Sequence, residues 1–256
     1  MMLLLPELTV LLFSLLFLFL SVMKRRDNMF TSAKLLSVLV LLITLFGITG
    51  RGELFSGAFR IDLFSQVFKI LLAMGFCLVI CMLENEDEIE RNFGAEYFMF
   101  LGFSTLGLMM LVSSIELISI VISLEISSYS LYVIVPLRKG QTRVQLEASM
   151  KYFFFGAIST GIMLYGMSYL YGIAGSTFLP DIIAAFPKFS HHPVGITALI
   201  LTLTGFFFKL SLFPMHFWAP DIYEGASNNT TTFIATVPKI AATALLLRII
   251  LIVPPL

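Results

Sequence analysis

The stretch Gly205-Phe-Phe-Phe-Lys209-Leu-Ser-Leu-Phe-Pro214-Met-His216-Phe-Trp218-Ala-Pro220-Asp-Ile-Tyr-Glu-Gly-Ala226 sets a lysine in an apolar run that two prolines then interrupt. A lysine at the centre of a membrane helix costs roughly 2.5–3.5 kcal/mol on insertion scales, so it faces the protein interior and by default marks an ion or proton path. Each proline removes a backbone donor and clashes with the preceding turn. The stretch therefore predicts a transmembrane helix that is broken just after Lys209.

The composition places the chain in a lipid bilayer. Of its 256 residues, 58% are hydrophobic and 12% are charged, and the mean hydropathy of +0.96 excludes a soluble protein with a polar shell. A span needs about 20 apolar residues. Eight stretches qualify: 3–22, 33–49, 64–83, 97–112, 117–136, 152–173, 194–223 with a break, and 231–253. We predict an all-α polytopic membrane protein of about eight transmembrane helices, the seventh broken and the eighth proline-kinked, so that two interrupted helices each carry a lysine.

The net charge of zero predicts neither a nucleic-acid partner nor binding to anionic lipids. The loops that follow odd-numbered spans contain most of the basic residues, among them Lys24, Arg25 and Arg26, whereas Lys69 is assigned to the opposite side. The positive-inside rule then predicts that the amino terminus faces outward. For Arg248, close to the end of the eighth span, we expect a structural role, with extension of its charged group to a membrane interface as the alternative.

Cysteine and histidine give little reason to expect a metal site. Cys77 and Cys81 lie one helical turn apart without the further ligands of a metal or cluster site, so we expect them to pack as small apolar side chains. His191 and His192 lie in an expected extracytoplasmic loop over residues 174–193 and lack sequence neighbours that would complete a site. We predict no metal and no cofactor bound by this chain.

The candidate proton relay consists of four titratable residues within or against spans: Glu125, Lys209, His216 and Lys239. Burial disfavours both a carboxylate and an ammonium, while an opposite charge nearby favours them. A Glu125–Lys209 pair that opens and closes would therefore release and recover a proton. The alternative is an internal salt bridge that only holds helices together. Gly205, one turn before the first lysine, leaves room for water or for a neighbouring helix.

Secondary candidates share helix faces with the relay. Helical spacing places Ser128 and Tyr129 on the face of the buried glutamate, and Thr236 on the face of the last lysine. Lys151 follows Glu147 by one turn, which predicts a surface ion pair at the start of the sixth span. The alternative for Lys151 is a point at which protons enter.

Several motifs together carry a family resemblance. Pro-x-His-x-Trp-x-Pro-Asp-x-Tyr-Glu-Gly occupies residues 214–225, Leu-Glu-Ala-Ser-Met-Lys-Tyr-Phe residues 146–153, Gly-Ala residues 156–157, Ser-Leu-Glu residues 123–125 and Pro-Lys-Ile-Ala residues 238–241. They resemble the antiporter-like subunit 2 (subunit N type) of respiratory complex I, NADH:ubiquinone oxidoreductase. The resemblance is clear from about residue 96 to residue 248, and before that only the order of spans agrees.

The resemblance implies a proton-pumping membrane-arm subunit with an antiporter-like helix bundle. By matching motif, Glu125 is the family's buried glutamate, Lys209 the lysine on its broken seventh helix and Lys239 that of the eighth, with His216 in the adjacent histidine position. In that family the glutamate–lysine pair stores and releases charge, and the eighth-helix lysine passes protons toward a second half-channel. Residues 1–95 would form three N-terminal helices with an acidic loop, and residues 96–256 the first antiporter-like repeat.

The same resemblance implies partners that carry the redox chemistry. NADH, FMN, iron–sulfur clusters and ubiquinone would belong to other complex I subunits in the same bilayer. Family members usually have about fourteen helices in two inverted repeats, whereas this sequence ends after its eighth expected span. We therefore expect either a shortened chain or a second polypeptide that carries the remaining helices.

Two further hypotheses stay open. Multisubunit cation/proton antiporters and membrane-bound hydrogenases share the lysine-bearing fold, and a non-pumping structural membrane subunit would use the same charges only to hold helices together. The Pro-Asp-Ile-Tyr-Glu-Gly and Val-Pro-Lys motifs favour the respiratory subunit. These motifs and the 26 phenylalanines favour a mitochondrial inner membrane, with a bacterial plasma membrane as the alternative.

Overall fold

The computed structural model describes residues 2–23, 28–83, 88–89, 91–140, 142–189 and 192–252. Eight of its helices are long and apolar enough to cross a membrane. They are α1 (Leu5–Val22), α2 (Met29–Phe46), α3 (Leu63–Met82), α4 (Gly94–Ser113), α5 (Leu117–Ile134), α6 (Thr142–Ala174), α8 (Pro193–Leu210) and α10 (Asn228–Ile252). The predicted fold class and the eight expected spans are confirmed. The basic cluster Lys24, Arg25 and Arg26 lies outside the described residues.

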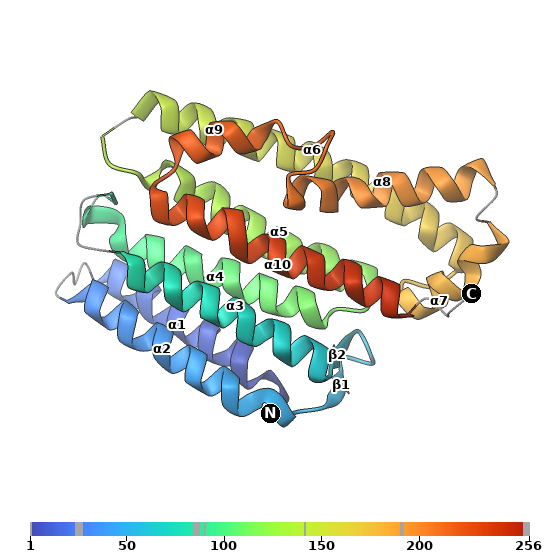
Figure 1. The fold of residues 1–256 in the computed structure, drawn as a ribbon, viewed down its shortest axis with the longest axis horizontal. Coiled ribbons are helices and arrows are strands. Elements are labelled where there is room, and N and C mark those ends of the chain that lie inside the picture. Colours follow the sequence, from blue (N-terminus) through green and yellow to red (C-terminus); the bar gives the residue numbers. More distant parts are fainter. Residues whose placement is uncertain are drawn as a thin grey trace.

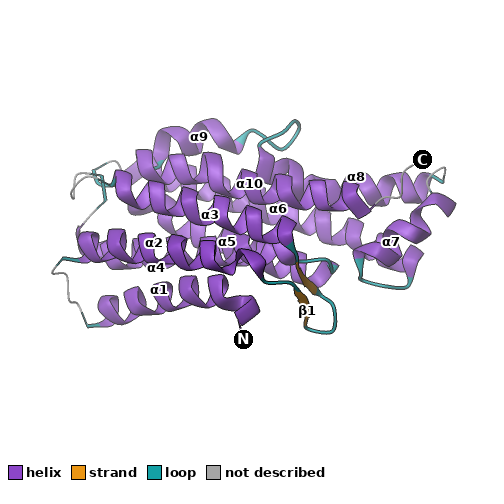
Figure 2. Ribbon diagram, turned by 60° about the horizontal axis from the view of Figure 1, so that its bottom comes forward, coloured by secondary structure: helices purple, strands orange, loops and turns teal. Residues whose placement is uncertain are grey.

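Short elements join the long helices (Figure 2). They are α7 (Leu179–Ala185), α9 (Trp218–Gly225), an antiparallel hairpin of β1 (Gly52–Leu54) and β2 (Phe59–Ile61), and the 3-10 helices η1 (Met2–Leu4), η2 (Gly47–Thr49), η3 (Arg91–Phe93), η4 (Val135–Leu137) and η5 (Phe186–Lys188). Gly52 pairs with Ile61 across the hairpin. The loop expected over residues 174–193 therefore contains helical structure, since α7 and η5 lie within it.

The long helices run side by side in one bundle (Figure 1). In that view α1 to α4 lie on one side, α6, α8 and α9 on the other, and α5 and α10 between them. Helix α4 packs against α1 and α5, α10 packs against α3, α4 and α8, and α6 packs extensively on α8. Because α4 contacts α1 as closely as it contacts α5, it links the two parts of the chain. The division at residue 95 stays a prediction.

Small residues allow α4 and α5 to approach closely. A Cβ atom on Gly107 would lie 2.7 Å from the backbone oxygen of Ser123 and 2.8 Å from the backbone nitrogen of Ser127. The hydroxyls of Ser104 and Ser127 share a hydrogen bond of 2.9 Å across the same interface. Packing of small residues and interhelical hydrogen bonds are the main source of helix association in lipid, where burial of apolar surface supplies no driving force.

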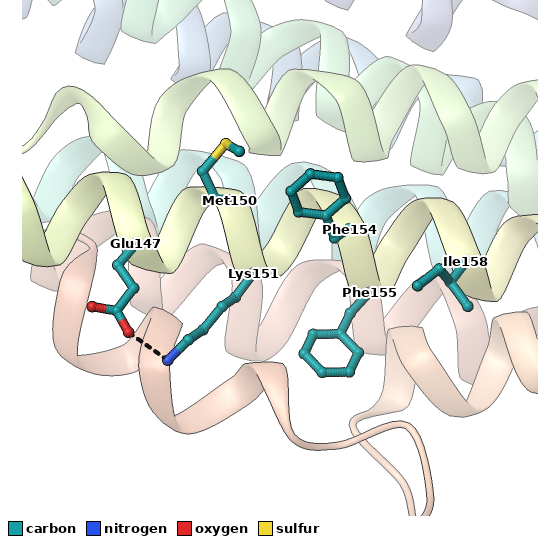
Figure 3. A pocket seen from close by; sticks show the side chains of 6 residues that line it. All are labelled: Glu147, Met150, Lys151, Phe154, Phe155 and Ile158. Carbon is teal, nitrogen blue, oxygen red and sulfur yellow. Dashed lines mark ion pairs between the residues drawn. The ribbon is translucent and has the colours of Figure 1, made fainter.

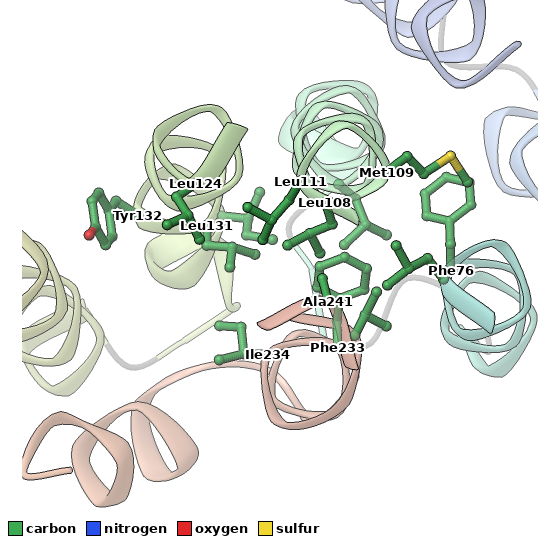
Figure 4. Close-up of a cluster of buried hydrophobic side chains, with 14 of the residues drawn as sticks. Phe76, Leu108, Met109, Leu111, Leu124, Leu131, Tyr132, Phe233, Ile234 and Ala241 are labelled. Atoms are coloured by element: carbon green, nitrogen blue, oxygen red, sulfur yellow. The ribbon is translucent and has the colours of Figure 1, made fainter. Parts of the chain in front are cut away.

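The core between α4, α5 and α10 is apolar (Figure 4). Leu108 and Leu111 of α4 meet Leu124 of α5 and Phe233 of α10, and each of these side chains is at most 2% exposed. This core buries one face of α10, whereas Thr236 and Thr243 of the same helix are exposed.

The predicted break after Lys209 is confirmed. Helix α8 ends at Leu210, and Ser211 adopts a left-handed conformation with φ of 57°. The indole Nε1 of Trp218 donates a hydrogen bond of 3.1 Å to the backbone oxygen of Phe208. The backbone N–H of Ser211 donates a bond of 3.1 Å to the same oxygen, so this carbonyl at the end of α8 accepts two hydrogen bonds. Helix α9 then resumes at Trp218.

The second interruption is not present. Helix α10 begins at Asn228 and continues through Pro238 to Ile252. The prediction that this helix is interrupted at Pro238 is wrong, whereas the predicted kink at this proline stays a prediction. A proline removes one backbone hydrogen bond but is tolerated in membrane helices when neighbouring helices cover the freed groups, and Pro238 is buried in the bundle.

Candidate functional site

Glu125 lies on the face of α5 that is turned toward α6. Its side chain is half-buried, and its Oε1 accepts a hydrogen bond of 2.7 Å from the hydroxyl of Thr160 on α6. The sequence analysis missed Thr160, because nothing in the spacing of α6 indicates which neighbouring helix it faces. Thr160 holds the carboxylate against α6.

Lys209 lies in the last turn of α8 and is buried, with 5% of the residue exposed. Its Nζ has no hydrogen-bond partner among the described residues. Glu125 is the charged group that acts on it electrostatically, although no ion pair of 4.0 Å or less joins the two side chains. The expected contact pair is therefore an open pair, in which the two charges lie apart within one bundle.

Gly205 gives space to a neighbouring helix. A Cβ at this position would collide with the sulfur of Met163 on α6. Of the two alternatives predicted for Gly205, the structure favours close helix contact over room for water. Ser159, also on α6, donates a hydrogen bond of 3.0 Å to the backbone oxygen of Thr204, which fixes α8 against α6.

Aromatic rings surround the end of α8 that carries Lys209. Tyr152 stacks on Trp218 with ring centroids 4.7 Å apart, and on Phe208 at 5.6 Å. Tyr132 of α5 meets Tyr152 edge to face at 4.8 Å. All four rings are at most 8% exposed. These rings reduce the access of water to the lysine and strengthen any charge interaction that it makes.

Lys239 lies half-buried on α10. Its Nζ donates a hydrogen bond of 3.3 Å to the hydroxyl of Tyr223 on α9 and lies 6.0 Å from the centre of that ring. Thr236 is exposed, and its hydroxyl donates a bond of 2.7 Å to the backbone oxygen of Thr232. Tyr223, which the sequence analysis did not select, is therefore the contact of Lys239, and Thr236 is not.

The remaining candidates are not brought to Lys209 by any contact in the described structure. Ser128 is buried and donates a hydrogen bond of 2.6 Å to the backbone oxygen of Leu124. Tyr129 is 57% exposed on the outer face of α5. His216 lies half-buried in the segment between α8 and α9 and contacts the rings of Phe213 and Phe217.

Lys151 forms the expected surface pair and a second one. Its Nζ lies 2.8 Å from Oε1 of Glu147 and 2.9 Å from Oδ1 of Asp221 on α9. Figure 3 shows Lys151 and Glu147 beside an open pocket of about 250 Å³, which is otherwise lined by the apolar side chains of Met150, Phe154, Phe155 and Ile158. The bond to Asp221 attaches the short helix α9 to α6.

Two ion pairs lie outside the candidate site, and the sequence analysis missed both. Lys69 is not in a loop, since it is fully buried in α3 with its Nζ 2.6 Å from Oε1 of Glu7 on α1. Arg248 is buried, and its guanidinium donates two hydrogen bonds of 2.9 Å to Asp62, which directly precedes α3. The residue partners are far apart in sequence, so no local pattern indicates them.

Asp62, the acidic partner of Arg248, lies outside the membrane spans, at the N-cap of α3. Burial by itself raises the pKa of Asp62, but the hydrogen bonds from Arg248 and from the backbone of Ser65 outweigh it and hold this pKa below its ordinary value. The ionised carboxylate is therefore the form that stabilises the start of α3.

Metal ligands do not gather in the part of the chain that the structure describes. No group there holds three or more His, Cys, Asp or Glu side chains in a suitable arrangement. Cys77 and Cys81 are free, with their sulfur atoms 4.0 Å apart. Of the histidine pair, His191 lies outside the described residues.

Known proteins resemble this chain over almost all of its length. It is 44% identical over 230 residues to NADH-quinone oxidoreductase subunit N 2 of Opitutus terrae, covering 87% of this chain and 48% of that protein. It is 43% identical over 247 residues to the protein of the same name from Syntrophobacter fumaroxidans, covering 96% and 52%. The predicted resemblance to subunit N is confirmed, and the chain spans about half the length of these relatives.

Solved structures agree with the sequence comparison. A chain of respiratory complex I from Thermus thermophilus matches with a TM-score of 0.79 and 28% identity, covering 95% of this chain and 52% of that one. A chain of an archaeal membrane-bound sulfane sulfur reductase matches with a TM-score of 0.77 at 20% identity, which shows a shared fold alone. Residues 114–255, more than half of the sequence, match the family described as NADH:quinone oxidoreductase/Mrp antiporter, TM. The chain belongs to this family of NADH:quinone oxidoreductase and Mrp antiporter membrane proteins.

Proposed function

We propose that this chain is a proton-translocating membrane-arm subunit of an NADH:quinone oxidoreductase, driven by electron transfer in other subunits. The observation that carries the proposal is the state of Lys209, a buried lysine on a broken helix with no hydrogen-bond partner among the described residues. Its nearest electrostatic influence is Glu125, which lies apart from it. An ionisable residue of this kind inside a membrane protein indicates an ion path.

The open pair suggests how a proton moves. When the Glu125 carboxylate approaches Lys209, its charge favours the protonated lysine, and when it withdraws, burial favours loss of that proton. Thr160 holds the carboxylate in the withdrawn position by its hydrogen bond. Lys239, hydrogen-bonded to Tyr223, is the next basic group on α10 and is proposed to accept protons from the pair. His216 and Lys151 stay secondary candidates.

A polar stripe on α10 supports a protein partner. Thr236 and Thr243 are exposed on the surface of this chain, and Lys239 is only half-buried beside them. A lysine and threonines facing lipid would be costly, so in the bilayer this face is covered by protein or lines a wet cavity. We propose that other complex I membrane-arm subunits are the partners. A second polypeptide that carries further C-terminal helices stays a prediction.

Cofactors and location follow from the same proposal. NADH, FMN, iron–sulfur clusters and ubiquinone are proposed to lie in partner subunits. The eight apolar helices place the chain in a membrane as a multi-pass protein. The relatives described above are bacterial, which supports the alternative of a bacterial plasma membrane, and the mitochondrial inner membrane stays a prediction.

Substitution of Lys209 tests the proposal against a structural role. We expect Lys209→Ala to assemble with its partners and to oxidise NADH while losing most proton translocation, because the relay has lost its buried base. Exposed Lys188→Ala is the matched control and is expected to pump normally. Loss of assembly with Lys209→Ala would instead support the non-pumping structural subunit.

Native electrophoresis followed by mass spectrometry identifies the assembly itself. Comigration with NADH-oxidising activity is the expected result, and a second polypeptide with the further helices would be found in the same band. Comigration with a cation/proton antiporter assembly or a hydrogenase would contradict the complex I proposal while leaving the membership of the family unchanged.

A further inference from the structure

A buried ion pair between α1 and α3 lies outside the site described above. Lys69 Nζ and Glu7 Oε1 are 2.6 Å apart, and the two side chains are 0% and 6% exposed. Both helices are otherwise strongly apolar candidate spans, with mean hydropathies of 2.2 and 2.1. We name Glu7 and Lys69 the α1–α3 pair.

The α1–α3 pair is inside the membrane span but near one of its ends. Lys69 follows the first residue of α3 by six positions, which corresponds to about 9 Å along a helix. Glu7 is the third residue of α1. The hairpin of β1 and β2 lies at this end of the bundle (Figure 1), and Leu3 lies beside Gly50 and Gly52 there. The pair is thus buried below the loops of one aqueous face.

The hydrogen bonding of the pair is incomplete. Its short contact lacks hydrogen-bond geometry, and both Glu7 oxygens and Lys69 Nζ have no hydrogen-bond partner among the described residues. Gln66, one turn before Lys69, is 1% exposed and its amide oxygen also lacks a partner. Gly47 lies beside both this oxygen and the ring of Pro6, so Gln66 is close to the residue that precedes Glu7.

This pattern is unfavourable for a bridge that serves only stability. Charges removed from water are compensated only when the geometry is good and further hydrogen bonds satisfy the remaining donors and acceptors. Buried polar groups in native proteins are almost always satisfied. Three polar atoms of the α1–α3 pair and the amide oxygen of the neighbouring Gln66 lack such bonds. A proton that moves between the two groups removes both charges and much of this cost.

The charged residues on the surrounding helices bond to other groups or lie far from the α1–α3 pair. Asp62 and Arg248 lie at the same end, but they bond to each other. Glu96 of α4 bonds to Ser21 at the far end of α1, and Lys34 lies near the start of α2, whose other end is the one that approaches the pair.

The other basic and acidic groups near this end are also occupied or distant. Glu53 and Arg60 pair with each other at the surface of the hairpin. On α10, Lys239 precedes Arg248 by nine residues and bonds to Tyr223. Arg51, directly before β1, is exposed to solvent. The ion pairs among the described residues at this end join neither Glu7 nor Lys69 to a third charge.

We propose that the α1–α3 pair is a second proton-exchanging site, separate from Glu125 and Lys209. The proton moves from Lys69 Nζ to a Glu7 carboxylate oxygen, so one N–H bond breaks, one O–H bond forms and two charges become none. The neutral amine then accepts a proton from a hydronium ion at the hairpin end, and the carboxyl group gives its proton to a water molecule, which becomes hydronium. Gln66, one turn before Lys69, carries a buried amide oxygen that is free to accept a hydrogen bond.

Infrared spectroscopy of the full chain in lipid bilayers tests this site directly. The expected result is a C=O stretching band of a protonated carboxyl group that shifts when H₂O is replaced by D₂O. Glu7→Gln should abolish this band, whereas Glu53→Gln, which removes an exposed carboxylate from the hairpin, should leave it unchanged. Indistinguishable spectra for the two variants would overturn the proposal.

Lys69→Arg separates proton exchange from bridging if Glu7→Gln fails to fold. Arginine keeps the positive charge and the bridge but is not deprotonated in proteins, so Glu7 should become permanently ionised and the band should disappear. Persistence of the band at wild-type intensity would contradict the proposal. Circular dichroism confirms that helix content is retained. The experiment needs no pumping assay, so its result is independent of the proposed function, beyond which this inference goes.

Discussion

Two glutamate–lysine pairs among the described residues differ in whether the partners touch. Glu7 and Lys69 touch at 2.6 Å between α1 and α3. Glu125 and Lys209 face the same region from α5 and α8, but the glutamate bonds to Thr160 and the lysine to no described group. The first is a closed pair and the second an open pair.

The difference follows from how the helices are held. Helices α1 and α3 are continuous, and their charged residues lie at the same end of the bundle. Helix α8 ends one residue after Lys209. Helix α6 packs against both α8 and α5 and so lies between them. A closed pair can exchange a proton within itself, whereas an open pair changes only when a helix or side chain moves. Burial alone therefore does not tell the two apart.

The largest expected effect is on the closed pair. Lys69→Met should lower the free energy of unfolding by about 3–5 kcal/mol, because it leaves Glu7 buried without its partner. Lys209→Met should not lower stability and is expected to raise it, since it removes a buried charge that has no contact. Reversible unfolding in one detergent or lipid system measures both. Equal losses would show that the two pairs contribute equally to stability and would contradict the distinction between them.

Double-mutant cycles measure the coupling free energy within each of the two pairs. For Glu7→Gln combined with Lys69→Met we expect a coupling free energy of about 0.5–3 kcal/mol, as for residues in contact. For Glu125→Gln combined with Lys209→Met the coupling free energy should stay below about 0.5 kcal/mol, because the two side chains do not touch. A large coupling in the second cycle would mean that Glu125 and Lys209 make contact in the folded ensemble.

Thr160→Val probes what keeps the open pair open. The substitution removes the hydroxyl that bonds to Glu125 and should cost about 1 kcal/mol of unfolding free energy. Thr197→Val, on the exposed face of α8, is the control and should be nearly neutral. If Thr160 holds the carboxylate away from Lys209, its loss should also raise the coupling between Glu125 and Lys209. Unchanged coupling would assign Thr160 a purely local role.

The smallest expected effect is the pH dependence of the neighbouring Asp62–Arg248 pair. The pKa of Asp62 is held below its ordinary value, so its contribution is present above the unfolded-state pKa of about 3.9 and is lost as pH falls through the lower folded-state value. The stability difference between the wild type and Asp62→Asn should shrink below about pH 5. Asp62 is one-third exposed, so added salt should reduce the difference. A difference that is constant with pH would contradict this.

The sequence predicted several local features correctly, and each has a local cause. Runs of apolar residues placed the eight spans, and Pro214 with Pro220 indicated the break after Lys209. The spacing of Glu147 and Lys151 predicted their ion pair. The prediction failed at Pro238, because the surrounding helices decide whether a proline interrupts a membrane helix.

By itself, the sequence determined which segments enter the bilayer and which of them carry charge, because hydropathy and helical period act over neighbouring residues. Only the tertiary structure decided which charges meet. Glu7 pairs with Lys69, Asp62 with Arg248 and Lys151 with Asp221 across different helices, while Lys209 is left without a contact. Those partners depend on which helix faces pack together, and that choice depends on small residues such as Gly107 and Gly205 that allow two helices to approach.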